Sequence, residues 1–281
     1  MATRARGRGG RRPPPPRASG TSDLGSRIVI AIPALVFAGL IIGFGHWVFA
    51  AGLFLLGVAC LHELFDLFHY AHPSRLAGYL GLAALLVAAE GGDRETVLLV
   101  FVCLVPAVFL LCLIQPLRAG MPGVAVTMLG LTWVGLAFAH AVLLRGLPHG
   151  DGVVIDVLVG TFIGDSGAYF GGRLLGTRPL APAISPNKTV EGLACGFVVG
   201  VLAVWFAGLY QDWLKGWEAL VLGAVVCAVA PLGDLFESYL KRDAGAKDTG
   251  RLFGAHGGAL DRLDAVLFTA VAGFYVWNAL Q

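Results

Sequence analysis

Long apolar runs separated by short polar segments constrain this chain of 281 residues more than any other feature. A membrane-spanning helix needs roughly 20 mostly apolar residues. By that measure the sequence predicts about nine spanning helices, at residues 27–44, 47–68, 76–90, 95–114, 121–145, 153–174, 190–210, 217–235 and 262–280. The run at 76–90 is short. We therefore expect an all-α fold, a polytopic bundle of transmembrane helices.

Composition supports a membrane protein and argues against a nucleic-acid partner. Hydrophobic residues make up 57% of the chain and charged residues 14%, with a mean hydropathy of +0.78; these values lie outside the usual range of soluble domains. The formal net charge is +2, but arginine is concentrated at the N-terminus, so the rest of the chain is slightly acidic. The five cysteines lie singly in apolar runs, and we interpret them as small core residues.

Three regions are predicted along the chain. Residues 1–26 are rich in Arg, Gly and Pro and lack the apolar content that would offset the entropy of ordering, which predicts a disordered basic cytoplasmic tail. Residues 27–150 contain the N-terminal transmembrane helices. Residues 151–281 form a C-terminal transmembrane region with cytoplasmic loops, in which we expect the catalytic residues.

The distribution of Lys and Arg predicts the orientation, because these residues accumulate in the short cytoplasmic loops of membrane proteins. With the N-terminus inside, the inside segments carry Arg75, Arg118, Arg173, Arg178, Lys188, Lys241, Arg242, Lys247, Arg251 and Arg262. The outside loops carry only Arg94, Arg145 and Lys215. This asymmetry favours an odd number of spans, with the C-terminus outside.

Glycines recur four residues apart in the sixth and seventh predicted spans. The pairs are Gly160 with Gly164, Gly167 with Gly171, Gly172 with Gly176, and Gly192 with Gly196 and Gly200. Such spacing lets two helix backbones approach closely. General packing of the bundle is the simpler interpretation, and a homodimer is an arrangement that such faces also allow.

The segment 238–264, between the last two predicted helices, gathers charged residues and glycines at a membrane edge. It contains Lys241, Arg242, Lys247, Arg251 and Arg262, the carboxylates Asp243, Asp248, Asp261 and Asp264, and the run His256-Gly257-Gly258. Carboxylates can hold Mg²⁺, which bridges phosphate oxygens, while Lys and Arg neutralise the remaining phosphate charge. This combination is typical of phosphoryl or nucleotidyl transfer.

A structural role is the alternative for each of these residues taken singly. Cations at a cytoplasmic helix end can follow the positive-inside bias or contact anionic lipid, and Asp261 can cap the final helix with Asp264 near its positive end. Asp165 and Asp234 lie inside predicted spans, where a carboxylate is costly and normally faces the bundle interior or a wet cavity. Both lie toward the cytoplasmic ends of their helices, so they can converge with the last loop.

The spacing of segment 238–264 resembles the signature of the phosphatidate cytidylyltransferase family. The matching residues read Ser238-x-x-Lys241-Arg242-x-x-x-x-Lys247-Asp248 and His256-Gly257-Gly258-x-x-Asp261-Arg262-x-Asp264. A second block, residues 164–173 with 185–192, is similar to the other shared region of that family. The sequence departs from the family at Gly254-Ala255, where Pro-Gly is common, and at Ser166, where Thr is common. The resemblance covers roughly residues 160–270, whereas the first five spans match only as apolar helices.

The resemblance implies a site for CTP and phosphatidic acid, with Mg²⁺ as the cofactor, with or without a second cation. Asp234 and Asp261 match positions of metal ligands, and Lys241, Asp248 and Asp264 complete the implied catalytic set. Substrate-binding roles are implied for Ser238, Arg242, Lys247, His256, Gly257, Gly258, Arg262, Asp165, Arg173, Ser185 and Lys188. The implied reaction joins a phosphatidate oxygen to the α-phosphorus of CTP and gives CDP-diacylglycerol and pyrophosphate, at a bacterial inner membrane.

Three other functions fit parts of the sequence. A CTP-dependent polyprenol kinase would use similar groups but transfer only the γ-phosphate, so its product would be CDP. A transporter or channel would place Asp165 and Asp234 along a route across the membrane. A scaffold that binds anionic lipid would leave the carboxylates of the last loop without a purpose.

A second polar cluster lies at the inner end of the second predicted span. It consists of His62, Glu63, Asp66, His69 and His72, of which His62, Asp66 and His69 share a helical face. Histidine and carboxylate on one helix can bind a transition metal. An interfacial polar helix end is the alternative, because a membrane di-iron oxygenase would carry several histidine-rich segments of this kind.

Overall fold

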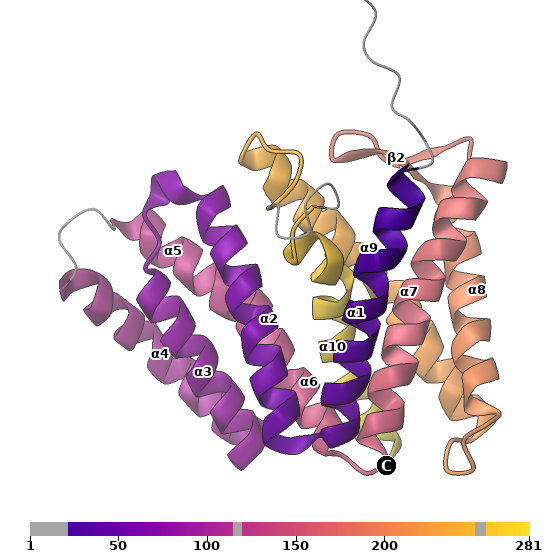
Figure 1. Ribbon diagram of the computed structural model, residues 1–281, viewed down its shortest axis with the longest axis horizontal. Helices are drawn as coiled ribbons and strands as arrows, with labels where there is room; N and C mark the ends of the chain where they lie inside the picture. The colour runs from indigo at the N-terminus through magenta and orange to yellow at the C-terminus, as the bar shows by residue number, and fades with distance from the viewer. Residues whose placement is uncertain (1–21, 115–119, 251–256) are drawn as a thin grey trace, which may run out of the picture. The chain divides into compact units, whose positions relative to one another are not determined.

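The computed structural model describes residues 22–114, 120–250 and 257–281 (Figure 1). By its internal contacts the chain divides into residues 1–37 and residues 38–281. The first unit contains most of α1 (Ser22–Phe44), which has Pro33 in its interior. This helix begins five residues earlier than expected, and the predicted tail before it lies outside the described residues.

The second unit is helical apart from one small hairpin. Its helices are α2 (His46–Leu67), α3 (Arg75–Gly91), α4 (Arg94–Ile114), α5 (Met121–Gly130), α6 (Leu136–Gly146), α7 (Gly150–Leu175), α8 (Val190–Gly208), α9 (Gly216–Asp243) and α10 (Leu260–Leu280). A π-helical turn, Leu131–Gly135, joins α5 to α6, and a 3₁₀ turn, His69–Ala71, follows α2. The antiparallel hairpin consists of β1 (Pro179–Ala181) and β2 (Ser185–Thr189).

Every predicted span corresponds to a helix, so the all-α transmembrane fold is confirmed. Within the described residues seven helices are long and apolar enough to cross a membrane, with α5 and α6 counted as one. The other two are α3, which has 17 residues, and α1, whose searched part, Ile32–Phe44, is short. The sequence did not predict the hairpin, because its five-residue second strand, Ser-Pro-Asn-Lys-Thr, is polar and half exposed.

Helix α9 differs most from expectation. It continues to Asp243, eight residues beyond the predicted end, so Ser238, Lys241 and Arg242 are helical rather than part of a loop. Asp261 and Asp264 likewise lie in the first turns of α10. A helix predicted from hydropathy ends where the apolar segment ends. The observed helix continues into a polar turn, whose cations interact favourably with the C-terminal end of the helix dipole. The predicted loop 238–264 is therefore partly helical.

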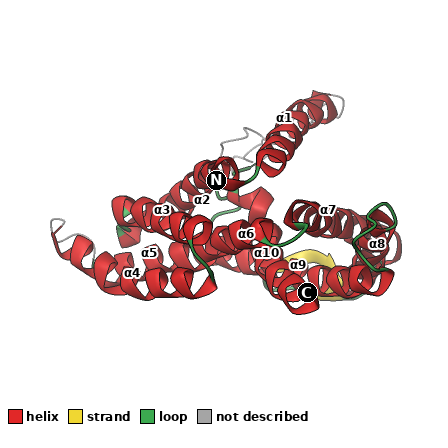
Figure 2. Ribbon diagram, turned by 90° about the horizontal axis from the view of Figure 1, so that it is seen from below, coloured by secondary structure: helices red, strands yellow, loops and turns green. Residues whose placement is uncertain are grey.

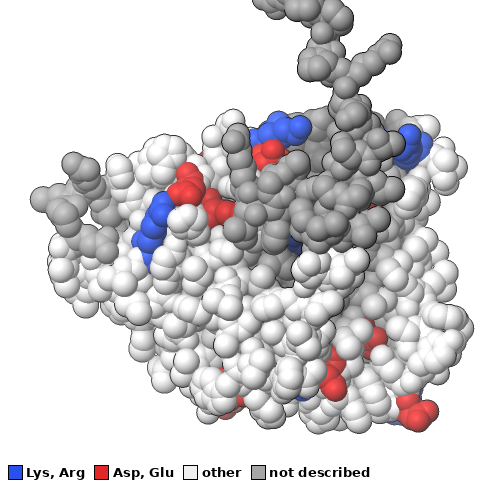
Figure 3. All heavy atoms as spheres, viewed as in Figure 1, with Lys and Arg blue, Asp and Glu red and all other residues white. Residues whose placement is uncertain are grey.

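With α5 and α6 taken as one span, consecutive helices run in opposite directions, so the second unit has two ends (Figures 1 and 2). We call the end with the β1–β2 hairpin and the α9–α10 connection the hairpin end, and the other the far end. The cations expected inside lie at the hairpin end, except Arg118 and Arg251, which are outside the described residues. Arg94, Arg145 and Lys215 lie at the far end. On the face shown in Figure 3 the surface between the two ends is largely uncharged.

The glycines of α7 and α8 face each other within the chain. A β-carbon on Gly196 would lie 2.6 Å from the carbonyl oxygen of Gly164, and one on Gly200 would lie 3.0 Å from that of Gly160. The two backbones therefore touch where a larger side chain would separate them. Because these glycines are used in packing inside one chain, they give no support for a homodimer.

We expect Gly196→Ala to destabilise the protein by about 1–3 kcal/mol, because the new methyl group must displace the backbone of α7. Gly39→Ala is the matched control, since a β-carbon at Gly39 would meet nothing within 4 Å. Thermal denaturation in detergent compares the two variants. Equal melting temperatures would contradict the close packing of α7 and α8.

Candidate active site

The β1–β2 hairpin brings a lysine against the end of α9. Lys188, on β2, donates from Nζ to Asp234 Oδ2 at 2.5 Å. The hairpin is fixed on both sides: Thr189 accepts the backbone N–H of Gly192 at the start of α8, and Arg242 Nε donates to the carbonyl of Ile184 at 3.2 Å. The short strand thus fixes the position of Lys188 over α9.

One face of α9 carries Asp234, Glu237, Ser238 and Lys241, at the i, i+3, i+4 and i+7 spacing that aligns side chains on a helix. Lys241 Nζ donates to Glu237 Oε2 at 2.6 Å and to Asp261 Oδ1 on α10 at 2.9 Å. The side chains of this triad are only 16%, 4% and 11% exposed, respectively. A lysine so enclosed is held by two carboxylates from two different helices.

Asp261 also holds the connection between α9 and α10. Its Oδ2 accepts the backbone N–H of Gly258 at 2.7 Å and that of Thr249 at 3.1 Å. Gly257 has φ +82°, a left-handed conformation that favours glycine. Asp261 therefore accepts backbone N–H groups of the connection through Oδ2 and Lys241 through Oδ1, while the N-cap position of α10, Ala259, has no side-chain cap. Its role in the site stays a prediction.

Asp264 lies deeper, where α9 and α10 touch. A β-carbon on Gly233 would overlap the carbonyl of Asp264, because the backbones of α9 and α10 approach closely there. Asp264 is buried. Asp165, on α7, is exposed, and its charge interacts with those of Asp234 and Lys188. The convergence of Asp165 and Asp234 with the start of α10 stays a prediction.

The chemistry of this cluster suits a hard divalent cation. Its carboxylates, those of Asp165, Asp234, Glu237, Asp261 and Asp264, outnumber its two lysines. Glu237 Oε1 is buried without a hydrogen-bond partner. In the part of the chain that the structure describes, no three acidic, His or Cys side chains are arranged to hold a metal by themselves. Mg²⁺ usually binds through one or two carboxylates together with substrate phosphates, so the residues present fit it.

Several predicted site residues lie around this centre rather than in it. Lys247 and Asp248 are exposed on the α9–α10 connection and form no ion pair among the described residues. Arg173 is exposed on α7 and donates to the hydroxyl of Tyr169 at 3.4 Å. Ser185 is half-buried at the start of β2, and Arg262 is exposed on α10. His256 lies outside the described residues.

Sequence reasoning missed two glutamates of this region. Glu237 was overlooked, although its place three residues after Asp234 and four before Lys241 is a usable helical signal. Glu63, on α2, was assigned to the histidine cluster. Its carboxylate instead accepts the backbone N–H groups of Ala259 and Leu260, both at 2.9 Å. No local pattern could have predicted a contact between residues so far apart in sequence.

Of the remaining residues of the histidine cluster, His62 and Asp66 lie around Arg75. Arg75 forms an ion pair with Asp66, and its Nη1 lies 3.3 Å from His62 Nδ1. His62 Nδ1 also lies 3.1 Å from the hydroxyl of Tyr79. His69 turns to the carbonyl of Asp66. The interpretation as an interfacial helix end therefore accounts for these side chains without a metal.

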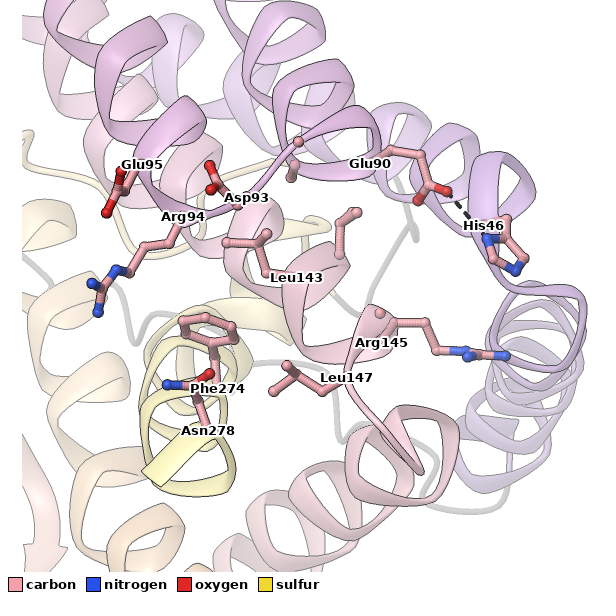
Figure 4. A pocket seen from close by; sticks show the side chains of 14 residues that line it. His46, Glu90, Asp93, Arg94, Glu95, Leu143, Arg145, Leu147, Phe274 and Asn278 are labelled. Atoms are coloured by element: carbon pink, nitrogen blue, oxygen red, sulfur yellow. Dashed lines mark ion pairs between the residues drawn. The ribbon is translucent and has the colours of Figure 1, made fainter. Parts of the chain in front are cut away.

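A cavity of about 560 Å³ lies at the far end, away from the carboxylate cluster (Figure 4). Its cations do not converge, because Arg94 and Arg145 extend to opposite sides in the view of Figure 4. Asp93 at its rim accepts the N–H and the hydroxyl of Thr96, which hold the pKa of that carboxyl below its usual range. The chemistry expected from the sequence lies at the hairpin end, so we place the candidate active site there.

The fold and the site together define a class of protein: a multi-pass integral membrane protein with a lysine–carboxylate centre at one end of its helices. A sequence profile of the cytidylyltransferase family matches residues 25–280. The chain belongs to this family, as its motifs predicted.

Relatives with an assigned name share part of the sequence. The chain is similar to the phosphatidate cytidylyltransferase of Mycobacterium bovis, with 34% identity over 190 residues, which is 65% of this chain and 62% of that protein. It is also similar to the phosphatidate cytidylyltransferase of Helicobacter pylori, with 46% identity over 120 residues, 42% and 44% of the two chains. The matched segments thus span less than two thirds of each relative.

Removing the charge of Lys241 should destabilise the protein strongly. Lys241→Met leaves two nearly buried carboxylates facing each other, which we expect to cost about 3 kcal/mol. Lys215→Met is the matched control, because Lys215 pairs with Glu218 but its side chain is 73% exposed; it should cost less than about 1 kcal/mol. Thermal denaturation measures both, and a similar loss in the two variants would show that the triad is not buried as described.

Proposed function

We propose that this protein transfers CMP from CTP to phosphatidic acid and releases CDP-diacylglycerol and pyrophosphate. The observation that carries the proposal is the pair of lysine–carboxylate contacts, Lys188 with Asp234 and Lys241 with Asp261, at one end of the helices. Membership of the cytidylyltransferase family supports the nucleotidyl transfer, and the names of the relatives support phosphatidate as the acceptor.

The chemistry requires positioning and charge neutralisation more than a base. A phosphate monoester already carries between one and two negative charges near neutral pH, so its oxygen can attack the α-phosphorus directly. A bond forms from that oxygen to the α-phosphorus, and the bond between the α-phosphorus and the bridging oxygen of pyrophosphate breaks. Lys188 and Lys241 would neutralise phosphate charge and, with the carboxylates, hold the reactants in line. A Mg²⁺ ion held by Asp234 and Asp261 would supply further charge stabilisation when bound.

Exposed apolar side chains beside the site support a lipid acceptor. On α7, Tyr169, Phe170 and Leu174 are each more than half exposed, and they surround Arg173. Leu232 and Tyr239 on α9 are also exposed. Acyl chains can cover such apolar surface while the phosphate of the same lipid reaches a cation. The acceptor would therefore enter sideways from the membrane, and CTP from the water.

The orientation is part of the proposal. The hairpin end carries most of the cations, which supports a cytoplasmic active site and a cytoplasmic N-terminus. The relatives named above come from bacteria, which supports the bacterial inner membrane. The described residues of one chain hold both lysine–carboxylate pairs, so the proposal does not require a second copy.

Pyrophosphate release tests the proposed reaction. Purified protein in detergent is given CTP and Mg²⁺, with and without phosphatidic acid. We expect release that depends on the lipid, with an equal amount of CDP-diacylglycerol. No pyrophosphate, together with CDP after addition of a polyprenol, would show a kinase instead, and no turnover of CTP with any acceptor would contradict both enzymatic readings.

Neutralising either proposed metal ligand should abolish most of this activity. We expect Asp234→Asn and Asp261→Asn to lower kcat by roughly 100-fold or more, the usual cost of losing one electrostatic contact to the transition state. The double variant His62→Ala/His69→Ala should remain close to the wild-type rate, because neither side chain belongs to the centre. Each variant is first checked for folding by its melting temperature. Full turnover by well-folded Asp261→Asn would contradict its role.

A further inference from the structure

Glu63 connects the N-terminal helices to the candidate active site. It lies near the end of α2, outside the part of the chain that carries the family motifs. Its side chain is 6% exposed. Burying a carboxylate costs free energy unless hydrogen-bond donors surround it. The donors that surround Glu63 therefore indicate its role.

Within the described residues, the hydrogen-bond partners of Glu63 belong to the α9–α10 connection and to the first residue of α10. Oε1 accepts the N–H of Ala259 and Oε2 accepts that of Leu260, each at 2.9 Å, at the N-terminus of α10. The hydroxyl of Thr249, in the first half of the connection, donates to Oε2 at 3.4 Å. The carboxylate thus bridges the two arms of the connection, the arm that leaves α9 and contains Thr249 and the arm that leads into α10 and contains Ala259.

Two glycines leave room for the carboxylate. A β-carbon on Gly250 would lie 2.5 Å from Glu63 Oε1, and one on Gly258 would overlap Oε2. Glycine at these positions lets the backbone of each arm close directly onto the side chain. The described residues on both sides of the connection, at Gly250 and Gly258, therefore contact Glu63 directly.

The same two arms are held by Asp261, which accepts the N–H groups of Thr249 and Gly258. Asp261 lies in the first turn of α10, and its other oxygen receives Lys241 at 2.9 Å. The first N–H groups of a helix lack partners within the helix and carry partial positive charge. By binding two of them, Glu63 fixes where α10 begins and therefore where Asp261 and Asp264 lie.

We propose that Glu63 is a positioning residue of the candidate active site, one that sets the place of Asp261 and Asp264 relative to Lys241 without touching the substrates. Its effect on turnover rests on the proposed function, whereas its effect on the connection does not. A carboxylate from the N-terminal helices thus becomes part of the catalytic region.

Hydrogen–deuterium exchange tests the structural half of the proposal. In Glu63→Gln the amide can accept only one of the two backbone N–H groups, so exchange at residues 257–262 should accelerate by roughly tenfold or more. Glu218→Gln is the matched control: Glu218 is also buried and also accepts a backbone N–H at a helix start, that of Lys215 at 3.0 Å, but at the far end of α9. It should leave exchange at residues 257–262 unchanged. Unchanged exchange in Glu63→Gln would overturn the proposal.

Turnover tests the positioning half. Supporting residues of this kind usually change activity or metal affinity by roughly 10- to 100-fold. We expect Glu63→Gln to lower kcat by that factor and to raise the Mg²⁺ concentration that gives half-maximal rate, with KM for phosphatidic acid little changed. Glu63→Asp keeps the charge but is one methylene shorter, so it should recover part of kcat and part of the Mg²⁺ affinity. This variant replaces Glu63→Gln in the test if Glu63→Gln does not fold.

The outcomes separate the two proposals. Wild-type protein without lipid-dependent pyrophosphate release would contradict the proposed function, while the exchange experiment would still test the contact of Glu63. Active wild-type protein with normal turnover and Mg²⁺ dependence in Glu63→Gln would overturn the positioning role. Equal losses in Glu63→Gln and Glu218→Gln, in proportion to their melting temperatures, would also overturn it.

Discussion

The compensation of buried charge at the membrane edge governs the arrangement of this protein. Carboxylates cannot remain in a region of low dielectric constant without N–H donors or cations around them. Three acidic side chains of this region meet that requirement differently: Asp234 with a lysine from a hairpin, Asp261 with a lysine and two backbone N–H groups, and Glu63 with the start of a helix. The partners come from separate parts of the chain, so the helices must pack before the site exists.

The apolar packing provides the rigid background for these contacts. Helices α7 and α8 touch through glycines, and α9 meets α10 at Gly233. Such close approaches leave little freedom for one helix to slide along another. The position of Asp234 relative to Asp264, and of the hairpin relative to α9, is therefore a property of the whole bundle. Changes in this packing should therefore lower stability and activity together.

Hydropathy predicted the helices well because burial in lipid requires long apolar segments whose backbone groups are satisfied internally. It did not predict where the helices end. Lys241 and Arg242 were expected in a loop, since they are polar, but they continue α9 beyond its apolar part. The β1–β2 hairpin was also missed, because strands this short and exposed have no alternating pattern.

Some residues of the site could likewise be predicted from the sequence, and others could not. The spacing of the family motifs identified Asp234, Lys241, Asp261 and Asp264, and the structure brings these together with Lys188. Lys247 and Asp248 fit the same motif but lie exposed on the connection. Glu63 was misassigned because its partners, Ala259 and Leu260, are backbone groups distant in sequence. Motifs record side chains at fixed spacing, and they contain no information about which main-chain groups a remote carboxylate will reach.

The enclosure of Glu63 by Gly250 and Gly258 also has an evolutionary consequence. A side chain at Gly258 would occupy the space of the Glu63 carboxylate, so the two positions can change only together. Among homologous sequences they should covary, although one belongs to the divergent half of the chain and the other to its recognisable motif. A chimera that joins the N-terminal half of one relative to the C-terminal half of another would inherit a functional centre only if both halves keep this match.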